Sequence, residues 1–114
     1  MDSILTSIKR LLGIAEEYDH FDPELVIHIN SVFMVLTQLG VGPSGGFSIT
    51  GAGETWDDFI PEGQNLESVK SYIYMKVRLL FDPPTSSALM DALTRSISEF
   101  EWRLNVAAES AQSD

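Results

Sequence analysis

The segment Asn65-Leu-Glu-Ser-Val-Lys-Ser-Tyr-Ile-Tyr-Met-Lys-Val-Arg-Leu-Leu-Phe-Asp-Pro-Pro84 decides the fold of this 114-residue chain. Apolar side chains recur in it at helical spacing, on a stripe wider than one neighbouring helix needs: Leu66, Val69, Ile73, Val77 and Leu80, broadened by Tyr72, Met75 and Leu79. Pro83 and Pro84 then end the helix, because proline cannot continue the helical hydrogen-bond pattern. We therefore expect a central helix that other helices cover from several sides.

The remaining face of this helix carries Lys70, Tyr74 and Arg78 at spacings of four residues. The chain has 7 Lys and Arg against 17 Asp and Glu, a formal net charge of −10. A row that contains two of so few cations suits an acidic neighbour, and we predict that it contributes to contacts between subunits. The alternative is that these side chains only meet solvent.

Length and composition indicate one domain, which we place at residues 1–106. A hydrophobic content of 44% supports a core despite the acidity, whereas a nucleic-acid-binding face would need a basic stripe. The absence of cysteine excludes disulfides, thiolate zinc sites and thiol nucleophiles, and it fits maturation in a reducing cytoplasm. We expect a soluble, unsecreted protein, since residues 1–14 lack a cleavage site and no apolar run approaches ~20 residues.

Three further helices flank the central one. The first is capped by Asp2 or Ser3 and ends at Gly13, and the second begins at Asp22-Pro23-Glu24 and ends at Gly40. The last opens at Thr85 or Ser86 and carries an apolar stripe formed by Leu89, Leu93, Ile97, Phe100 and Leu104. Residues 107–114 have little to bury, so we expect a flexible C-terminal tail.

Between residues 40 and 64 the composition shifts to glycine, proline and small polar residues around two apolar fragments. We predict a short β-hairpin at about 47–59. The fold class is therefore all-α, a small bundle of about four helices with one β-hairpin insertion. A lone hairpin is marginal in water, so its apolar residues must pack on something. Packing on another subunit makes Phe47, Ile49, Trp56 and Phe59 interface candidates, and packing on the chain's own helices is the alternative.

The sequence contains no convincing catalytic, cofactor or metal site. Gly40-Val-Gly-Pro-Ser-Gly45 has the spacing of a dinucleotide loop but follows a helix and precedes a strand-like segment. His20, Glu24 and His28 could share a metal only if the helix began before Pro23. Neither the pair Asp57-Asp58 nor the pair Glu99/Glu101 has a partner that would tune a pKa for acid–base work. We predict no enzymatic activity and no cofactor.

Several segments, in this order, resemble the head–tail connector or adaptor proteins of long-tailed bacteriophages. The resemblance covers nearly the whole chain and is carried by Ile8-Lys-Arg-Leu-Leu-Gly-Ile14, Ile27-His-Ile-Asn-Ser-Val-Phe33, Leu39-Gly-Val-Gly-Pro43, Trp56-Asp-Asp-Phe59, Tyr74-Met-Lys-Val-Arg-Leu-Leu-Phe-Asp-Pro-Pro84 and Glu101-Trp-Arg-Leu-Asn-Val-Ala-Ala108.

The resemblance implies a structural virion protein, made in the host bacterial cytoplasm and located at the head–tail junction. It implies a ring, commonly of about twelve subunits, between the portal protein and the head-completion or tail protein. DNA would pass through its channel without specific binding, which an acidic lumen favours. The family would place the C-terminal segment, from about Asn105, against the portal, so the portal-binding candidates are Trp102, Arg103, Asn105 and Val106. The runner-up function is a small acidic regulator, such as a DNA-mimic inhibitor.

Overall fold

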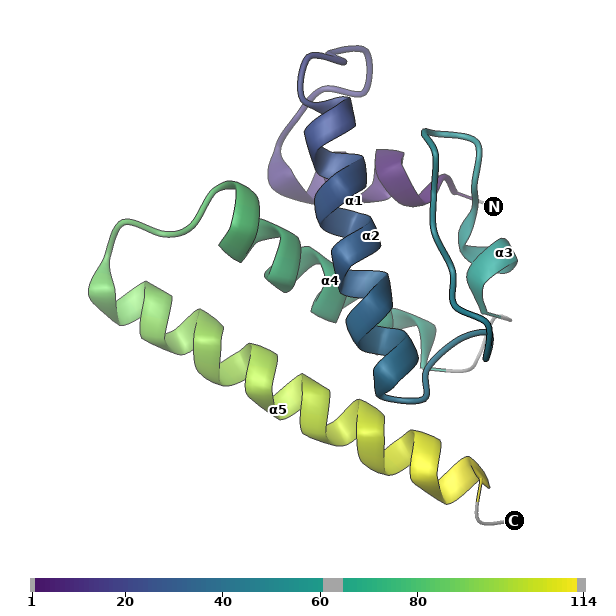
Figure 1. The fold of residues 1–114 in the computed structure, drawn as a ribbon. Coiled ribbons are helices and arrows are strands. Elements are labelled where there is room, and N and C mark those ends of the chain that lie inside the picture. The colour runs from purple at the N-terminus through teal and green to yellow at the C-terminus, as the bar shows by residue number, and fades with distance from the viewer. Residues whose placement is uncertain (1, 61–64, 113–114) are drawn as a thin grey trace.

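Helix α4 (Leu66–Phe81) lies at the centre of the structure and contacts α1 (Ile4–Leu12), α2 (Asp22–Gln38) and α5 (Ser87–Gln112). The structure is a computed structural model that describes residues 2–60 and 65–112. A single-turn helix, α3 (Trp56–Phe59), completes the described elements. In Figure 1 the long α5 runs along one side of the bundle, and α3 with the 41–55 loop lies on the other side of α2. The helical class and the central place of α4 are those predicted from the sequence.

Local signals set the helix ends. The Ser3 hydroxyl accepts a hydrogen bond from the Thr6 amide at 3.2 Å and caps α1, and Gly13 ends α1 at a φ of 83°. Pro23 lies in the first turn of α2, where a missing amide hydrogen costs nothing. Before Pro83, the Asp82 amide still bonds to the Arg78 carbonyl at 2.8 Å, and there α4 ends.

One continuous apolar core joins these helices. Its buried side chains come from all five: Ile4, Leu5, Ile8, Leu25, Ile29, Val32, Phe33, Leu36, Ile49, Trp56, Phe59, Ile60, Leu66, Val69, Tyr72, Ile73, Val77, Ile97 and Leu104. Only two of them, Ile97 and Leu104, belong to α5. Helix α5 is therefore attached along a narrow stripe, and most of its circumference faces outward.

The predicted β-hairpin at about 47–59 is wrong. Within residues 47–59, all of which the structure describes, the two apolar fragments do not pair as strands. Thr55 instead forms an isolated antiparallel bridge with Ser3, and the second apolar fragment forms helix α3. Trp56 and Phe59 are three residues apart, which places both on the inner side of a helical turn. The Asp58 carboxylate accepts a hydrogen bond from the Thr55 amide at 2.9 Å and fixes the start of that turn.

The middle of the segment before α3 is held by a side chain of α2. The Asn30 Oδ1 accepts from the Ile49 amide at 2.7 Å, and the Asn30 Nδ2 donates to the Ile49 carbonyl at 3.0 Å. The Glu54 carboxylate then closes the turn by accepting from the Thr50 amide and hydroxyl at 3.0 and 2.8 Å. These hydrogen bonds lower the pKa of Glu54 below its ordinary value.

Helix α5 continues through residue 112, so residues 107–112 of the predicted tail are its last turns. The positions after 112 lie outside the described residues. Whether these turns are mobile in the free subunit stays a prediction, because the ordering of a helical end depends on its partners.

Candidate functional site

The apolar residues of the 41–60 segment pack inside their own subunit. Ile49, Trp56 and Phe59 are buried, and the half-buried Phe47 ring packs on Phe33 and Phe59 at centroid distances of 5.1 and 5.3 Å. This agrees with the alternative interpretation, in which the segment packs on the chain's own helices. Their contribution to a contact between subunits stays a prediction, and it would require the segment to move.

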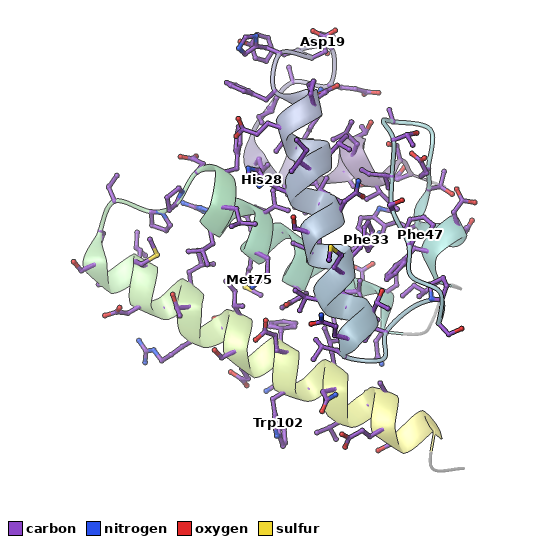
Figure 2. The ribbon with its side chains drawn as sticks, viewed as in Figure 1. Asp19, His28, Phe33, Phe47, Met75 and Trp102 are labelled. Atoms are coloured by element: carbon purple, nitrogen blue, oxygen red, sulfur yellow. The ribbon has the colours of Figure 1, made fainter. Side chains whose placement is uncertain are left out.

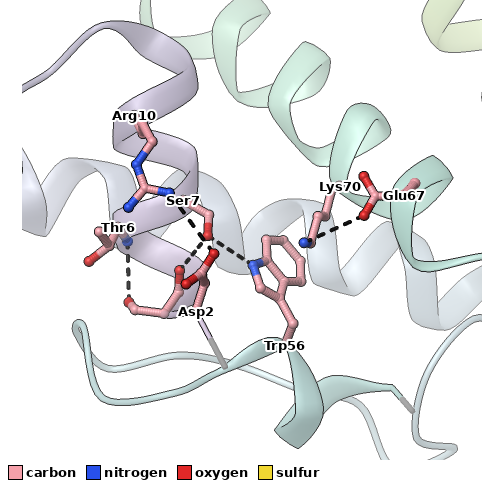
Figure 3. Close-up of polar contacts among 8 residues, drawn as sticks. Asp2, Thr6, Ser7, Arg10, Trp56, Glu67 and Lys70 are labelled. Atoms are coloured by element: carbon pink, nitrogen blue, oxygen red, sulfur yellow. Dashed lines mark hydrogen bonds and ion pairs between the residues drawn. The ribbon is translucent and has the colours of Figure 1, made fainter. Parts of the chain in front are cut away.

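Trp56 is fully buried and ties α3 to α1 and α4. Its indole nitrogen donates to the Ser7 hydroxyl at 3.0 Å, and the Lys70 ammonium lies 5.4 Å from its ring centroid (Figure 3). Lys70 also pairs with Glu67 at 3.8 Å. Lys70 therefore covers the tryptophan face and gains a cation–π contact.

The predicted row Lys70, Tyr74 and Arg78 lies on α4 with all three side chains half-buried. The Arg78 guanidinium donates to the Tyr74 hydroxyl at 3.1 Å. Arg78 also borders a shallow groove of about 270 Å³ between α4 and α5, whose other walls are Pro84, Leu89, Ala92, Leu93 and Ser96. The role of the row Lys70, Tyr74 and Arg78 in contacts between subunits stays a prediction.

Polar contacts hold α5 against α4 and against the end of α2. The buried Tyr72 hydroxyl donates to the Glu101 carboxylate at 2.6 Å, and Lys76 lies 3.7 Å from the same oxygen. Burial, reinforced by the Glu101 carboxylate, raises the pKa of Tyr72 far above its ordinary value. One turn further on, Asn105 donates to the Leu39 carbonyl at 3.4 Å, so α5 is also bonded to the end of α2.

The predicted portal-binding residues fall on two sides of α5. Trp102 is 67% exposed and points away from the bundle (Figure 2), and Val106 is exposed one turn later. Arg103 is also exposed and forms an ion pair with Glu99. Asn105 instead faces α2, which it contacts through Leu39. Trp102 and Val106 thus form an apolar outer face that the subunit itself leaves uncovered.

Sequence reasoning missed two structural residues, Asn30 and Lys9. Lys9 is 2% exposed, pairs with Asp22 at 2.9 Å and donates to the Glu16 carbonyl at 2.8 Å, so it fastens the α1–α2 connection. Each lies at the edge of the apolar stripe on its helix, and a polar residue at that position is the only local signal. The partners lie 7 to 19 residues away and are not apparent from periodicity.

The glycine-rich segment and the two histidines make contacts within the subunit. A Cβ on Gly42 would lie 2.4 Å from the Phe59 ring, so the glycine-rich turn is pressed against α3. His28 lies 3.5 Å from Glu24, while His20 stacks edge-on against Phe21.

Across residues 2–60 and 65–112, no group of three or more metal-ligating side chains is close enough to hold an ion. Within the same ranges, no helix has the length and apolar character to span a bilayer.

Comparison with known proteins identifies the family. A family model described as phage connector protein matches residues 4–111, which is nearly all of the chain and every described helix. No curated protein and no solved structure matches significantly. The matched range includes all six segments that carried the sequence resemblance. The chain belongs to the phage connector protein family.

Proposed function

We propose that this protein is the head–tail connector subunit that forms a ring, of about twelve copies, between the portal and the head-completion or tail proteins. Family membership over residues 4–111 carries this proposal, since it gives the chain a structural role in a phage connector. The ring, and its contacts with the portal and the tail-side protein, are supported by the surfaces that the isolated subunit leaves exposed.

Two separate apolar surfaces suit a ring. On α2, Ile27 and Met34 are mostly exposed, seven residues apart on the side opposite the core. On α5, Trp102 and Val106 form the second surface. A closed ring is built from heterologous contacts, in which one surface of a subunit meets a different surface of the next. A subunit with two such surfaces fits this requirement better than one with a single self-complementary patch.

The charge distribution suits a channel for DNA. Within the described ranges, five of the seven cations have a carboxylate within 4 Å, namely Lys9, Arg10, Lys70, Lys76 and Arg103. Among the described residues no Asp or Glu is buried, so the acidic excess lies at the surface. Repulsion between such a surface and the phosphates keeps DNA from adhering as it passes.

The portal contact belongs, in this proposal, to the C-terminal end of α5. Val106 is exposed there, and Ala107 and Ala108 are half-buried beside a cavity of about 350 Å³. Trp102 and Arg103 lie one turn earlier on the same helix. The opposite end of the ring receives the tail-side protein.

The test is to mix the purified subunit with the purified portal protein and to measure the mass of the complex by native mass spectrometry. A complex of one portal with a single ring of subunits, seen stacked by electron microscopy, is the expected result. Bovine serum albumin at equal concentration is the control for non-specific association. A subunit that stays monomeric and leaves the portal mass unchanged would refute the proposed function.

A further inference from the structure

The outer face of α5 combines an exposed aromatic side chain with a cation that has no carboxylate partner in the described structure. Arg95, Glu99, Trp102 and Val106 follow one another at helical spacing on this face. Arg103 pairs with Glu99, whereas Arg95 bonds only to the Asp91 carbonyl of its own helix, at 3.5 Å. Trp and Arg are the residues most enriched in the energetic centres of protein interfaces.

A complementary hollow lies between α2 and the loop that follows it. The groove has a volume of about 610 Å³ and is lined by Met34, Thr37, Gln38, Gly45, Gly46, Phe47 and Ser48. Met34 is 67% exposed, so the groove has an uncovered apolar wall. The opposite wall includes Gly45, Gly46 and Ser48, which have no side chain or a small one, so this wall is shallow. This shape admits a flat aromatic side chain from outside.

An exposed carboxylate lies on α3, the helix that packs against the groove wall. Its wall residue Phe47 packs on Phe59 of α3, and the exposed Asp57 lies two residues before Phe59. Asp57 is free to meet a cation, whereas Asp58 is engaged in the α3 cap. Trp102 and Arg95 lie about 10 Å apart along α5, so one helix can present its indole to the groove and its guanidinium to α3 of the same neighbouring copy.

The two surfaces face different directions. Trp102 points away from the bundle (Figure 2), and the 41–55 loop with α3 lies across α2 from α5 (Figure 1). Trp102 therefore cannot enter the groove of its own chain, but it can enter the groove of a second copy. Repetition of such a contact propagates from copy to copy and does not stop at a dimer.

We propose that Trp102 of one copy inserts into the groove between α2 and the 45–48 loop of the next copy, with Arg95 against the next copy's Asp57. The proposal rests on the ring proposed above and assigns its subunit contact. Opposite charges at Arg95 and Asp57 set the register, and the indole supplies the apolar contact. Trp102, which the resemblance placed among the portal-binding candidates, thereby belongs to the subunit contact, in keeping with the α5 ring surface described above.

The chain has no cysteine, which permits a clean cross-linking test. An arginine–carboxylate contact separates the two Cα atoms by more than the ~7 Å that a disulfide tolerates, so a short bismaleimide is used. The double variant Arg95→Cys with Asp57→Cys, assembled on the portal, should give a ladder of dimers, trimers and longer chains on a denaturing gel. Each single variant should give no species beyond a dimer. Leu11→Cys with Asp57→Cys, which moves one exposed thiol to α1, is the matched control and should give no ladder.

Variants test the energetics of the same contact. Trp102→Ala should weaken ring assembly by at least about 30-fold, the effect of losing a central interface tryptophan. Arg95→Glu should also weaken it, and adding Asp57→Arg should restore assembly. Arg10→Glu makes the same charge change on α1 and should leave assembly unchanged. Circular dichroism melting checks that each variant folds.

The outcomes separate this inference from the function on which it rests. Absence of any ring from the unmodified protein contradicts both. Rings without a ladder, or rings unaffected by Trp102→Ala, contradict the inference alone. Rings that form normally from Trp102→Ala but no longer bind the portal would return Trp102 to the portal contact and overturn the inference.

Discussion

Replacement of Trp56 by alanine should destabilise the subunit itself. Trp56 is fully buried, and truncating a buried Trp or Phe to alanine costs about 3–5 kcal/mol. Its indole nitrogen also donates to the Ser7 hydroxyl, and loss of that hydrogen bond adds about 1 kcal/mol. The total of about 4–6 kcal/mol compares with a free energy of unfolding of about 5–15 kcal/mol for a domain of this kind. At roughly 4 °C per kcal/mol, the melting temperature should fall by about 16–24 °C.

Thermal melting followed by circular dichroism measures this fall. Trp102→Ala is the matched control, because it removes the same side chain from an exposed position and should change stability by no more than about 0.5 kcal/mol. In Trp102→Phe, Trp56 is the sole tryptophan and should show blue-shifted, poorly quenched fluorescence. A Trp56→Ala variant that melts like Trp102→Ala and fails only in assembly would refute the buried position of Trp56.

Three further predictions follow from individual contacts. Asn30→Ala removes both hydrogen bonds to the Ile49 backbone, so amide exchange in the 41–55 loop should accelerate while the exchange of α4 stays unchanged. Because the pKa of Tyr72 is raised in the folded state, the protonated Tyr72 contributes its full stabilisation below the ordinary tyrosine pKa of about 10, and this stabilisation is lost as the pH rises above that value. Ultraviolet titration should show Tyr72 ionising only when the protein unfolds. Tyr72→Phe should reduce the loss of stability at alkaline pH. Lys9→Met should lower stability by about 1–3 kcal/mol in urea unfolding, because the partly buried Asp22 is left without its ion-pair partner, and an unchanged midpoint would contradict the role of Lys9.

The helices could be predicted because their signals are local. The caps at Ser3 and Gly13, the proline at position 23 and the Pro83-Pro84 stop each act within a few residues of the helix end that they set. The wide apolar stripe of α4 likewise required several covering helices, and the structure has them. Periodicity and capping therefore determine most of this fold.

The 41–60 segment could not be predicted because distant partners determine its conformation. Ile49 is held by Asn30, 19 residues earlier, and Trp56 bonds to Ser7, 49 residues earlier. The apolar spacing of Trp56 and Phe59 fits a helical turn, but four residues are too few for periodicity to decide. The same limit applies to the candidate surface residues, since periodicity predicts which residues face outward but not which cavity on a second copy would receive them.

Internal ion pairs make assembly depend on few groups. Lys9, Lys70 and Lys76 are each within 4 Å of a carboxylate of their own subunit, so they are not free to neutralise an adjacent copy. Copies that carry −10 each repel one another at long range. A stable contact must therefore combine apolar burial with a cation that its own subunit leaves unpaired. Arg78 also lacks a carboxylate partner among the described residues, but it is half-buried and bonded to Tyr74, whereas Arg95 is exposed on the same face of α5 as Trp102. This combination on the outer face of one helix favours a second copy as the partner.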